Sequence, residues 1–264
     1  SILNLLVCYG SSFRLDDIVK INGQDEVSVH RDIIALVNIG LVDIIAEIDG
    51  QYTYKIFHEK AQQDIYDNID FDQRCLIHVS IARAFLKDSL DWTVPDTVFF
   101  IANHFNSGLP MLEDLTEKYV VARLNVVAGD YSKKAGSYDL SLNFYKRVIG
   151  LVGEDHWATH AKFMKSLYVQ SIETAYYCHN VDFAASIEKK YDLMVSHFFE
   201  QLPIVELKLN YFLVTGKFNE SILLGRDTLK KLGLNFERSI PLQQLKNDYL
   251  ELKLVLESEI TNKG

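Results

Sequence analysis

The sequence predicts an all-α protein built from packed helical hairpins, with one small β-hairpin near the N-terminus. Two observations lead to this class. Only 4 Pro and 13 Gly interrupt the 264 residues, too few for a many-stranded sandwich or barrel with a turn about every ten residues. In addition, one helical pattern recurs three times in the second half of the chain, and arrays of helical hairpins are built from repeats of similar length.

The repeated pattern consists of an aromatic residue, a small residue three positions later, an aliphatic residue next to it and another aliphatic seven positions further on. These spacings place all four on one face of a helix. The copies are offset by 45 and then 35 residues: Tyr138, Ser141, Leu142 and Ile149; Phe183, Ser186, Ile187 and Met194; Phe218, Ser221, Ile222 and Leu229. The small residue suits a close helix crossing, so a stacked repeat array is expected. The alternative is three unrelated amphipathic helices in an ordinary all-α domain.

The first 58 residues predict a separate small module. Helices are expected over Ile2–Tyr9, over Leu15–Ile21, and along the stripe Val29, Ile33, Leu36 and Val37, which Gly40 ends. The next stretch, 41–57, alternates and has Asp49-Gly50 at its centre, a strong hairpin signal. Three helices followed by a hairpin is the winged-helix order. We therefore assign residues 1–58 to a winged-helix-like module with a β-hairpin wing.

Winged helices often bind DNA through the third helix and the wing, so this function has to be weighed. Up to His58 the chain has eight Asp and Glu against four Lys and Arg, and the third helix offers Arg31 beside Glu26 and Asp32. The whole chain has a net charge of -9. Nucleic-acid phosphates require a positive surface, so we expect no nucleic-acid partner.

After the module the pattern predicts helix after helix, over 59–264. Pro95 suits the first position of one of them, and connections of about two to seven residues force neighbouring helices to pack as antiparallel hairpins. Buried stripes are expected at Leu76, Ile77, Ile81, Ala84 and Phe85, and at Val98, Ile101, Ala102 and Phe105. The expected helices cover 59–68, 72–86, 95–107, 113–135, a helix from Tyr138, 157–177, a helix from Phe183, 205–214, 218–232 and 242–260.

Composition is consistent with a globular cytoplasmic protein. Hydrophobic residues make up 48% of the chain, enough for a large core. Cys8, Cys75 and Cys178 lie far apart and are expected to be reduced core residues rather than a disulfide or zinc framework. No apolar stretch is long enough for a membrane span, and no basic segment precedes the apolar start. Because the chain begins at Ser1 inside an expected helix, we interpret it as a piece of a longer polypeptide.

No group of residues predicts catalysis, and we expect no catalytic, cofactor-binding or metal-binding residue. Neither of the glycine-rich phosphate-binding patterns is present. His156 and His160 have the spacing of a zinc pair, but position 157 is Trp where a zinc hydrolase would need an acid, so a helix N-terminus capped by Asp155 is favoured. The charge runs Asp16-Asp17 and Glu188 to Lys190 are expected on solvated faces. His58, His78 and His104 are expected to be hydrogen-bonded core or rim residues.

Several segments resemble, in order, the region that follows the winged helix in large signal-transduction ATPases of the STAND type. Phe57 to Tyr66 resembles the Phe-x-His-Asp-x-x-Gln-x-Ala-x-Tyr stretch of that family. Further matches are Ile77-His78 with 81–86 to Leu-His-x-x-Ile-Gly-Arg-x-Leu, 101–108 to Asn-His-x-Asn-x-Gly, 122–138 to an Ala-x-Leu-Asn-x-x-Ala-Gly run, and then Trp157, Leu167-Tyr168, Glu173, Tyr176, Gly216-Lys217-Phe218 and Leu232-Gly233. Departures are Glu59 for Asp, Ala82 for Gly and Ser141 for the Ala of a tetratricopeptide-like helix.

The resemblance implies a tetratricopeptide-like (TPR-like) repeat array, an α-solenoid, over 59–264. It also implies a parent protein with an ATP-binding domain upstream and with serine/threonine kinase, GAF or hybrid histidine kinase domains elsewhere. The fragment itself would need no cofactor and would be non-catalytic. It would bind a protein partner or neighbouring domains, or a small ligand. Alternative hypotheses are the sensor region of a STAND-type transcriptional activator, a small-molecule- or peptide-binding array and, last, an enzyme.

Overall fold

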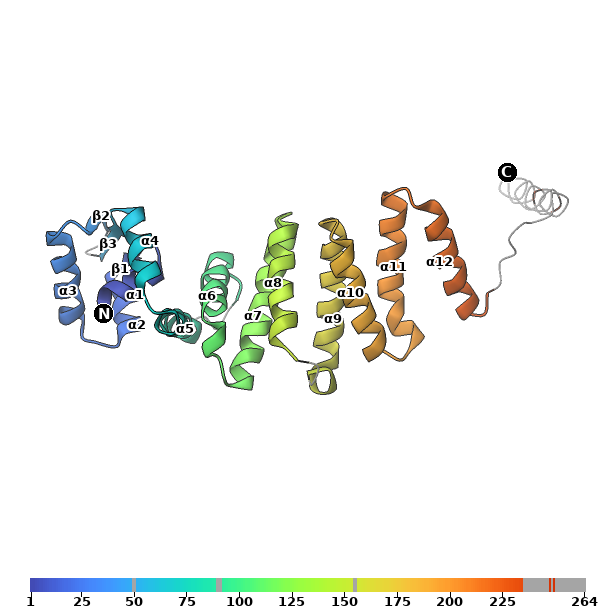
Figure 1. Ribbon diagram of the computed structural model, residues 1–264, viewed down its shortest axis with the longest axis horizontal. Coiled ribbons are helices and arrows are strands. Elements are labelled where there is room, and N and C mark those ends of the chain that lie inside the picture. The colour runs from blue at the N-terminus through green and yellow to red at the C-terminus, as the bar shows by residue number, and fades with distance from the viewer. Residues whose placement is uncertain (49–50, 89–91, 154–155, 235–246, 248, 250–264) are drawn as a thin grey trace, which may run out of the picture. The chain divides into compact units, whose positions relative to one another are not determined.

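The computed structural model describes residues 1–48, 51–88, 92–153 and 156–234, together with residues 247 and 249. These residues form twelve α-helices, one short 3-10 helix and a three-stranded sheet (Figure 1). The coarse expectation of a mostly helical chain is therefore confirmed. The chain divides into two compact units, 1–194 and 195–264. The expected boundary between the module and the array, at residue 58, lies inside the first unit and stays a prediction.

The first 58 residues contain the expected helices and hairpin, and one strand that the sequence did not predict. Their order is α1 (Ile2–Tyr9), β1 (Ser12–Arg14), α2 (Leu15–Asn22), α3 (Glu26–Asn38), β2 (Val42–Ile48) and β3 (Gln51–Ile56). Strand β3 lies between β1 and β2 and is antiparallel to both. A strand of three residues is too short to show alternation, which explains why β1 was missed. The turn at Asp49-Gly50 lies outside the described residues.

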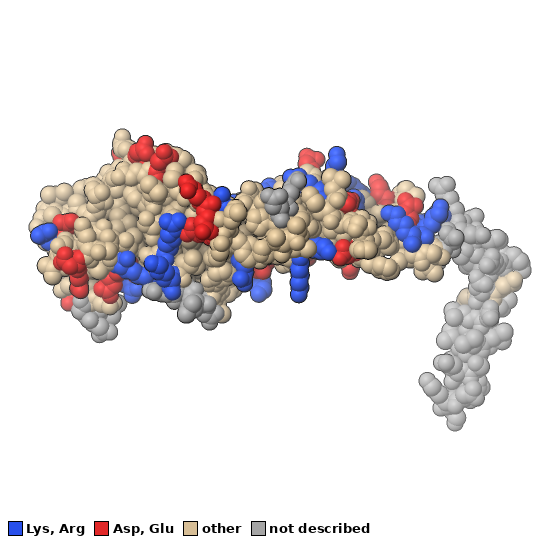
Figure 2. All heavy atoms as spheres, turned by 90° about the horizontal axis from the view of Figure 1, so that it is seen from below, with Lys and Arg blue, Asp and Glu red and all other residues tan. Residues whose placement is uncertain are grey.

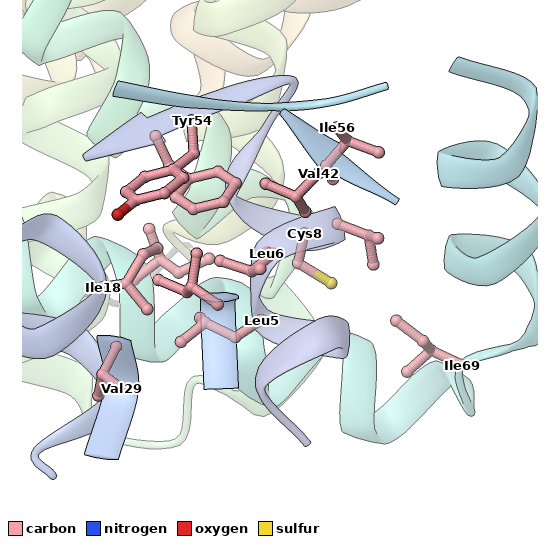
Figure 3. Packing of buried hydrophobic residues seen from close by; sticks show 13 residues of the cluster. Leu5, Leu6, Cys8, Ile18, Val29, Val42, Tyr54, Ile56 and Ile69 are labelled. Carbon is pink, nitrogen blue, oxygen red and sulfur yellow. The ribbon is translucent and has the colours of Figure 1, made fainter. Parts of the chain in front are cut away.

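The core of this module lies between its helices and its sheet (Figure 3). Leu6, Ile18 and Ile33 come from the three helices and are fully buried. Tyr54 of β3 reaches toward them, and its ring stacks on Phe13 of β1 with 5.6 Å between the centroids. Full burial of each such side chain stabilises the fold by about 1.5–3 kcal/mol. The apolar side chains of the strands and those of the helices therefore pack into one cluster.

The next helices are α4 (Glu59–Asn68), α5 (Phe71–Asp88) and α6 (Pro95–Ser107), followed by the 3-10 helix η1 (Leu109–Met111). The stripe expected on α6 is buried in full. The stripe expected on α5 is partly wrong, because Leu76 is 53% exposed, whereas Cys75, Val79 and Ala82 are buried. The end of α6 approaches α5 very closely: a Cβ at Gly108 would lie 2.4 Å from Cγ2 of Val79. Small residues of α5 face this contact, and the larger leucine is turned outward.

Four further helices complete the first unit: α7 (Leu115–Lys134), α8 (Tyr138–Leu151), α9 (His156–Tyr177) and α10 (Val181–Met194). Each packs against the next in the chain, as the green to yellow ribbons of Figure 1 show. In the second unit, α11 (Phe198–Val214) packs against α12 (Phe218–Lys231). Helix α11 begins seven residues before the expected start and contains Pro203. The expected helix over 242–260 lies outside the described residues.

Three hairpins share one turn geometry. Gly136, His179 and Gly216 have positive φ angles of 77°, 53° and 74°. The next residue in each turn donates its N–H to the carbonyl five residues earlier, which is the Schellman ending of a helix. These bonds are Ser137 to Ser132 at 2.9 Å, Asn180 to Ala175 at 2.8 Å and Lys217 to Phe212 at 2.8 Å. The hairpins α7–α8, α9–α10 and α11–α12 therefore share this turn, and the same helix ending also follows α3 at Gly40 and α12 at Gly233.

This equivalence corrects the offsets of the sequence repeat. The three turns lie 43 and 37 residues apart, not 45 and 35, so the middle copy was aligned two residues too late. Burial agrees with the corrected register, because Ser141, Ala184 and Ser221 occupy the same place after each turn and are all buried. Ser186, the expected small residue of α10, is exposed. The alanine at 184 allows the close crossing that had been attributed to the serine.

Candidate functional site

A pair of buried histidines is the most unusual polar feature of the described residues. Nδ1 of His78 on α5 lies 2.8 Å from Nδ1 of His104 on α6, and the two side chains are only 6% and 7% exposed. The Tyr66 hydroxyl on α4 lies 3.0 Å from Nε2 of His78. At the other end, the backbone of Tyr9, the last residue of α1, acts on His104 as a hydrogen-bond acceptor and so favours a higher pKa of that ring. One chain of hydrogen bonds thus joins four helices.

With the Tyr9 carbonyl as the acceptor of His104, one arrangement of protons satisfies every member of this chain. The Tyr9 carbonyl can only accept, so His104 donates through Nε2–H and its Nδ1 must accept. His78 then donates Nδ1–H to His104, and its free Nε2 accepts the hydroxyl proton of Tyr66. Both imidazoles are neutral in this arrangement. Every polar atom of the chain has a partner, as buried polar groups require.

Burial keeps both histidines neutral. Desolvation lowers the pKa of His78 to about 4, and the nearby positive charge of Arg74 acts in the same direction. Desolvation and the neighbouring His78 lower the pKa of His104 to about 3. A carboxylate beside either ring would have raised its pKa. The core position expected for these two histidines is therefore confirmed, and the partner of each one is the other.

The histidine chain assembles residues from three separate segments of the resemblance to the STAND ATPases. Tyr66 ends the first segment, His78 belongs to the second and His104 to the third. A further contact joins the third and fourth segments, since the Asn106 amide donates to Asn125 Oδ1 at 2.8 Å. The sequence analysis identified each of these residues but did not predict that they are in contact. The signal that could have found it is the presence of a polar residue at a helical position facing the core in each segment.

Glycines in the same segments mark close helix contacts. A Cβ at Gly129 of α7 would lie 2.5 Å from Cε1 of Tyr145 on α8. That tyrosine is fully buried, and its hydroxyl donates to Asp130 at 2.6 Å, so its ring is held at both ends. Position 129 thus requires glycine for packing rather than for a special φ. The resemblance therefore rests on packing and hydrogen-bonding residues, and none of these contacts is a catalytic arrangement.

The His156 and His160 pair does not have the geometry of a zinc pair on one regular helix. His160 has φ -133° and ψ 40°, which interrupts α9 and removes the regular i to i+4 relation. Instead, both rings lie beside Tyr119 of α7, with ring centroids 6.4 Å and 4.2 Å away. Asp155, expected to cap the helix, lies outside the described residues. Among those residues no three His, Cys, Asp or Glu side chains gather as metal ligands, and the absence of a metal from this chain stays a prediction.

The aromatic side chains around His160 line an open groove of about 490 Å³ between α7 and α9. Tyr119 packs edge-on against Phe163 at 5.5 Å, and Thr159, Lys162 and Ser166 complete the lining. No carboxylate lines the groove. The wall is therefore aromatic with a basic side chain beside it, which suits an apolar side chain next to an acidic one. Sequence reasoning missed Tyr119 and Phe163 because they are 44 residues apart on two helices.

Neither of the two charge runs expected on solvated faces is fully exposed. Asp17 accepts a hydrogen bond from the Tyr9 hydroxyl at 3.0 Å, and its side chain is only 13% exposed. Glu188 of α10 is 8% exposed and accepts the hydroxyl of Tyr176 on α9. Both acids therefore fix helices rather than face water. The expectation that His58 is a core or rim residue is wrong, because its side chain is exposed and lies beside the Phe57 ring.

The surface of the N-terminal module does not form a basic face. Arg31 on α3 is exposed and lies 3.9 Å from Asp32, while Arg14 pairs with Asp17. Figure 2 shows acidic and basic side chains interspersed over the module on its visible side. This charge distribution offers a poor match to a nucleic-acid backbone. The expectation that the chain binds no nucleic acid stays a prediction.

The thiols and the hydropathy of the helices agree with the sequence analysis. Cys8, Cys75 and Cys178 are free; the first two are buried and the third is half-buried. Burial raises the pKa of Cys8 to about 11, which makes it a poor nucleophile. In the part of the chain that the structure describes, no helix combines the length and apolar character that crossing a bilayer requires.

Comparison with known proteins gives one distant similarity. The chain is 18% identical over 225 residues to a hybrid signal transduction histidine kinase G of Dictyostelium discoideum. The match covers 76% of this chain but only 6% of that protein, so the chain corresponds to a small part of its length. No protein-family model and no solved structure matches the chain. The similarity points to a signal-transduction context.

Proposed function

We propose that this chain is a non-catalytic regulatory region of a larger cytoplasmic signalling protein, acting by binding protein. A winged-helix-like module would occupy residues 1–58 and a TPR-like array residues 59–264. The region would sense a partner or ligand and relay its state to ATPase or kinase domains outside this chain. The observation that carries the proposal is the set of three equivalent hairpin turns at Gly136, His179 and Gly216.

Topology supports the winged-helix part of the proposal. The order α1-β1-α2-α3-β2-β3, with the sheet order β1-β3-β2, has three helices and a terminal hairpin packed over a short first strand. The acidic charge of this module and the pairing of Arg31 favour a structural role over DNA binding. We therefore propose that the module joins the array to whatever lies upstream, and that its contacts are with protein.

The hairpins support the array part. Stacked helical pairs leave an extended surface that is not needed for the core, and such surfaces bind proteins. In this chain the groove beside Tyr119 and Phe163 is the best-defined part of that surface, since aromatic residues are enriched at protein interfaces. We propose that it receives an apolar side chain flanked by an acidic residue. Lys162 would contact the acidic residue, and the partner would be a neighbouring domain or a separate protein.

The proposal is tested with the full-length parent protein and with this chain. Chemical cross-linking of the parent, followed by mass spectrometry, should connect Lys162 to another domain or to a bound protein. Combined Tyr119→Ala and Phe163→Ala substitutions should reduce that cross-link at least tenfold and change the regulated kinase or ATPase activity. Phe71→Ala is the matched control, because Phe71 of α5 is 55% exposed and does not line the groove. ATP hydrolysis by the isolated 264-residue chain would contradict the non-catalytic role.

A further inference from the structure

The junction between the N-terminal module and the following helices depends on Tyr9. Its ring packs on Phe85 and Phe100, with centroids 6.1 Å and 5.3 Å away. Its hydroxyl donates to Asp17, and its carbonyl accepts from His104. Carbonyl groups at the end of a helix have no intrahelical donor, so His104 supplies the partner that α1 lacks. The end of α1 is thereby fixed to α6 by both its side chain and its backbone.

Breaking any one bond of the histidine chain leaves a buried polar atom without a partner. If α1 moves away, the Nε2–H of His104 loses its acceptor; if α4 moves away, Nε2 of His78 loses its donor. Each loss costs more than an ordinary hydrogen bond contributes, because the ring that loses its partner is buried. Movement of one helix therefore weakens the hold on the other. The chain is expected to open as a unit.

The charges around the pair decide what protonation would do. On α1 and α2 the titratable groups are Cys8, Tyr9, Asp16, Asp17 and Lys20. Asp17 already binds Arg14 of β1, and Lys20 lies over the Phe85 ring. Helix α4 presents Tyr66, α5 presents Arg74 and Cys75, and α6 presents His104 itself. The formal charge that acts on His78 is that of Arg74, which is positive and lies 4.0 Å from Asp67 of α4. A proton on either imidazole would add a cation to a buried site near Arg74 and would remove an acceptor from the chain.

We propose that Tyr66, His78, His104 and the Tyr9 carbonyl form a proton-ordered latch, which holds the N-terminal module on α5 and α6 and opens when either imidazole is protonated. The latch is closed at neutral pH. An open junction exposes both histidines, which then titrate near their ordinary value of 6.5. Below that pH the open form binds protons that the closed form excludes. Opening is favoured by about tenfold per pH unit for each histidine that is protonated on opening.

Hydrogen exchange of the 264-residue chain, corrected for the chemical exchange rate, tests the latch between pH 6.5 and 5.5. Protection of α1 and α4 should fall together, by about fivefold if one histidine is protonated on opening and by about thirtyfold if both are, while protection of α8 and α9 stays within about twofold. A double variant, His78→Leu with His104→Leu, should lose this pH dependence. His58→Gln, at an exposed histidine, should keep it. Unchanged wild-type protection, or pH dependence that persists in the double variant, would overturn the proposal.

A second measurement does not require any variant to fold. Nitrogen-15 NMR of the histidine rings at pH 7 should show His78 as the Nδ1–H tautomer and His104 as the Nε2–H tautomer. Free neutral histidine favours the Nε2–H form, so the state of His78 is the discriminating signal. An Nε2–H tautomer at His78, or a charged ring at either position, would show that the proton order is wrong and would remove the physical basis of the latch.

Discussion

The junction of α1, α4, α5 and α6 and the hairpins from α7 to α10 hold helices together by different chemistry. In the junction a single polar chain runs through the contact, and every donor has one acceptor. In the hairpins, apolar stripes and one repeated turn bring the helices together, and the polar contacts, such as Tyr145 with Asp130 and Tyr176 with Glu188, are separate pairs. Two helices that meet through apolar stripes can shift along each other at small cost in free energy. A shift across a hydrogen-bonded chain breaks its bonds, so only one register satisfies it. The junction is therefore specified by its hydrogen bonds, and the hairpins by their turns and small residues.

The largest expected effect is at the junction. His104→Leu should destabilise the first unit by about 3 kcal/mol, because it leaves the Tyr9 carbonyl and the Nδ1–H of His78 buried without partners. Adding His78→Leu should cost much less than His78→Leu does alone, since the pair is then replaced by apolar groups. Urea denaturation of the four proteins of this double-mutant cycle measures the coupling. Additive costs would show that the two rings act independently.

A smaller effect is expected at the closest hairpin contact. Gly129→Ala places a methyl group 2.5 Å from the Tyr145 ring, which cannot retreat, and should cost about 2 kcal/mol. Gly150→Ala is the matched control, because no atom lies within 4 Å of its new Cβ and it is inside α8. That control should stabilise the unit by about 0.5–1 kcal/mol through helix propensity. Equal effects at the two glycines would refute the close-packing argument.

Removing a polar contact inside the hairpins should cost no more than the Gly129→Ala substitution does. Tyr176→Phe removes a hydroxyl that donates to the buried carboxylate of Glu188 and should cost about 1.5 kcal/mol. Tyr177→Phe provides the control at the adjacent position, since Tyr177 is 52% exposed and its hydroxyl lies 3.4 Å from Glu173. It should change the unfolding free energy by less than about 0.5 kcal/mol. A larger loss at Tyr177 would reverse this ranking.

Local signals determined how much of the fold could be predicted. Helices α4 and α6 were predicted with correct bounds because Pro95 and the flanking turn residues act within a few positions. The histidine pair could not be predicted, because residues 78 and 104 meet only after α5 and α6 have packed. Leu76 was misplaced for the same reason, since the close approach of Gly108 decides which face of α5 is buried. The aromatic groove depends on the contact of α7 with α9 and on the interruption at His160.

The smallest expected effect concerns the three equivalent turns, where one copy lacks the residue that the other two share. Gly136 and Gly216 occupy left-handed backbone positions that favour glycine, whereas His179 adopts φ 53° with a side chain. Left-handed geometry costs a residue other than glycine about 1 kcal/mol. His179→Gly should therefore stabilise the first unit by about 0.5–1 kcal/mol, and Gly136→Ala should destabilise it by a similar amount, both measured by urea denaturation. The middle repeat was misaligned by two residues because Val181 stands where the other copies have Tyr138 and Phe218, and the alignment followed the aromatic Phe183 instead. If His179→Gly is destabilising, the imidazole makes a contact that the turn geometry does not account for, and the three turns are equivalent in backbone only.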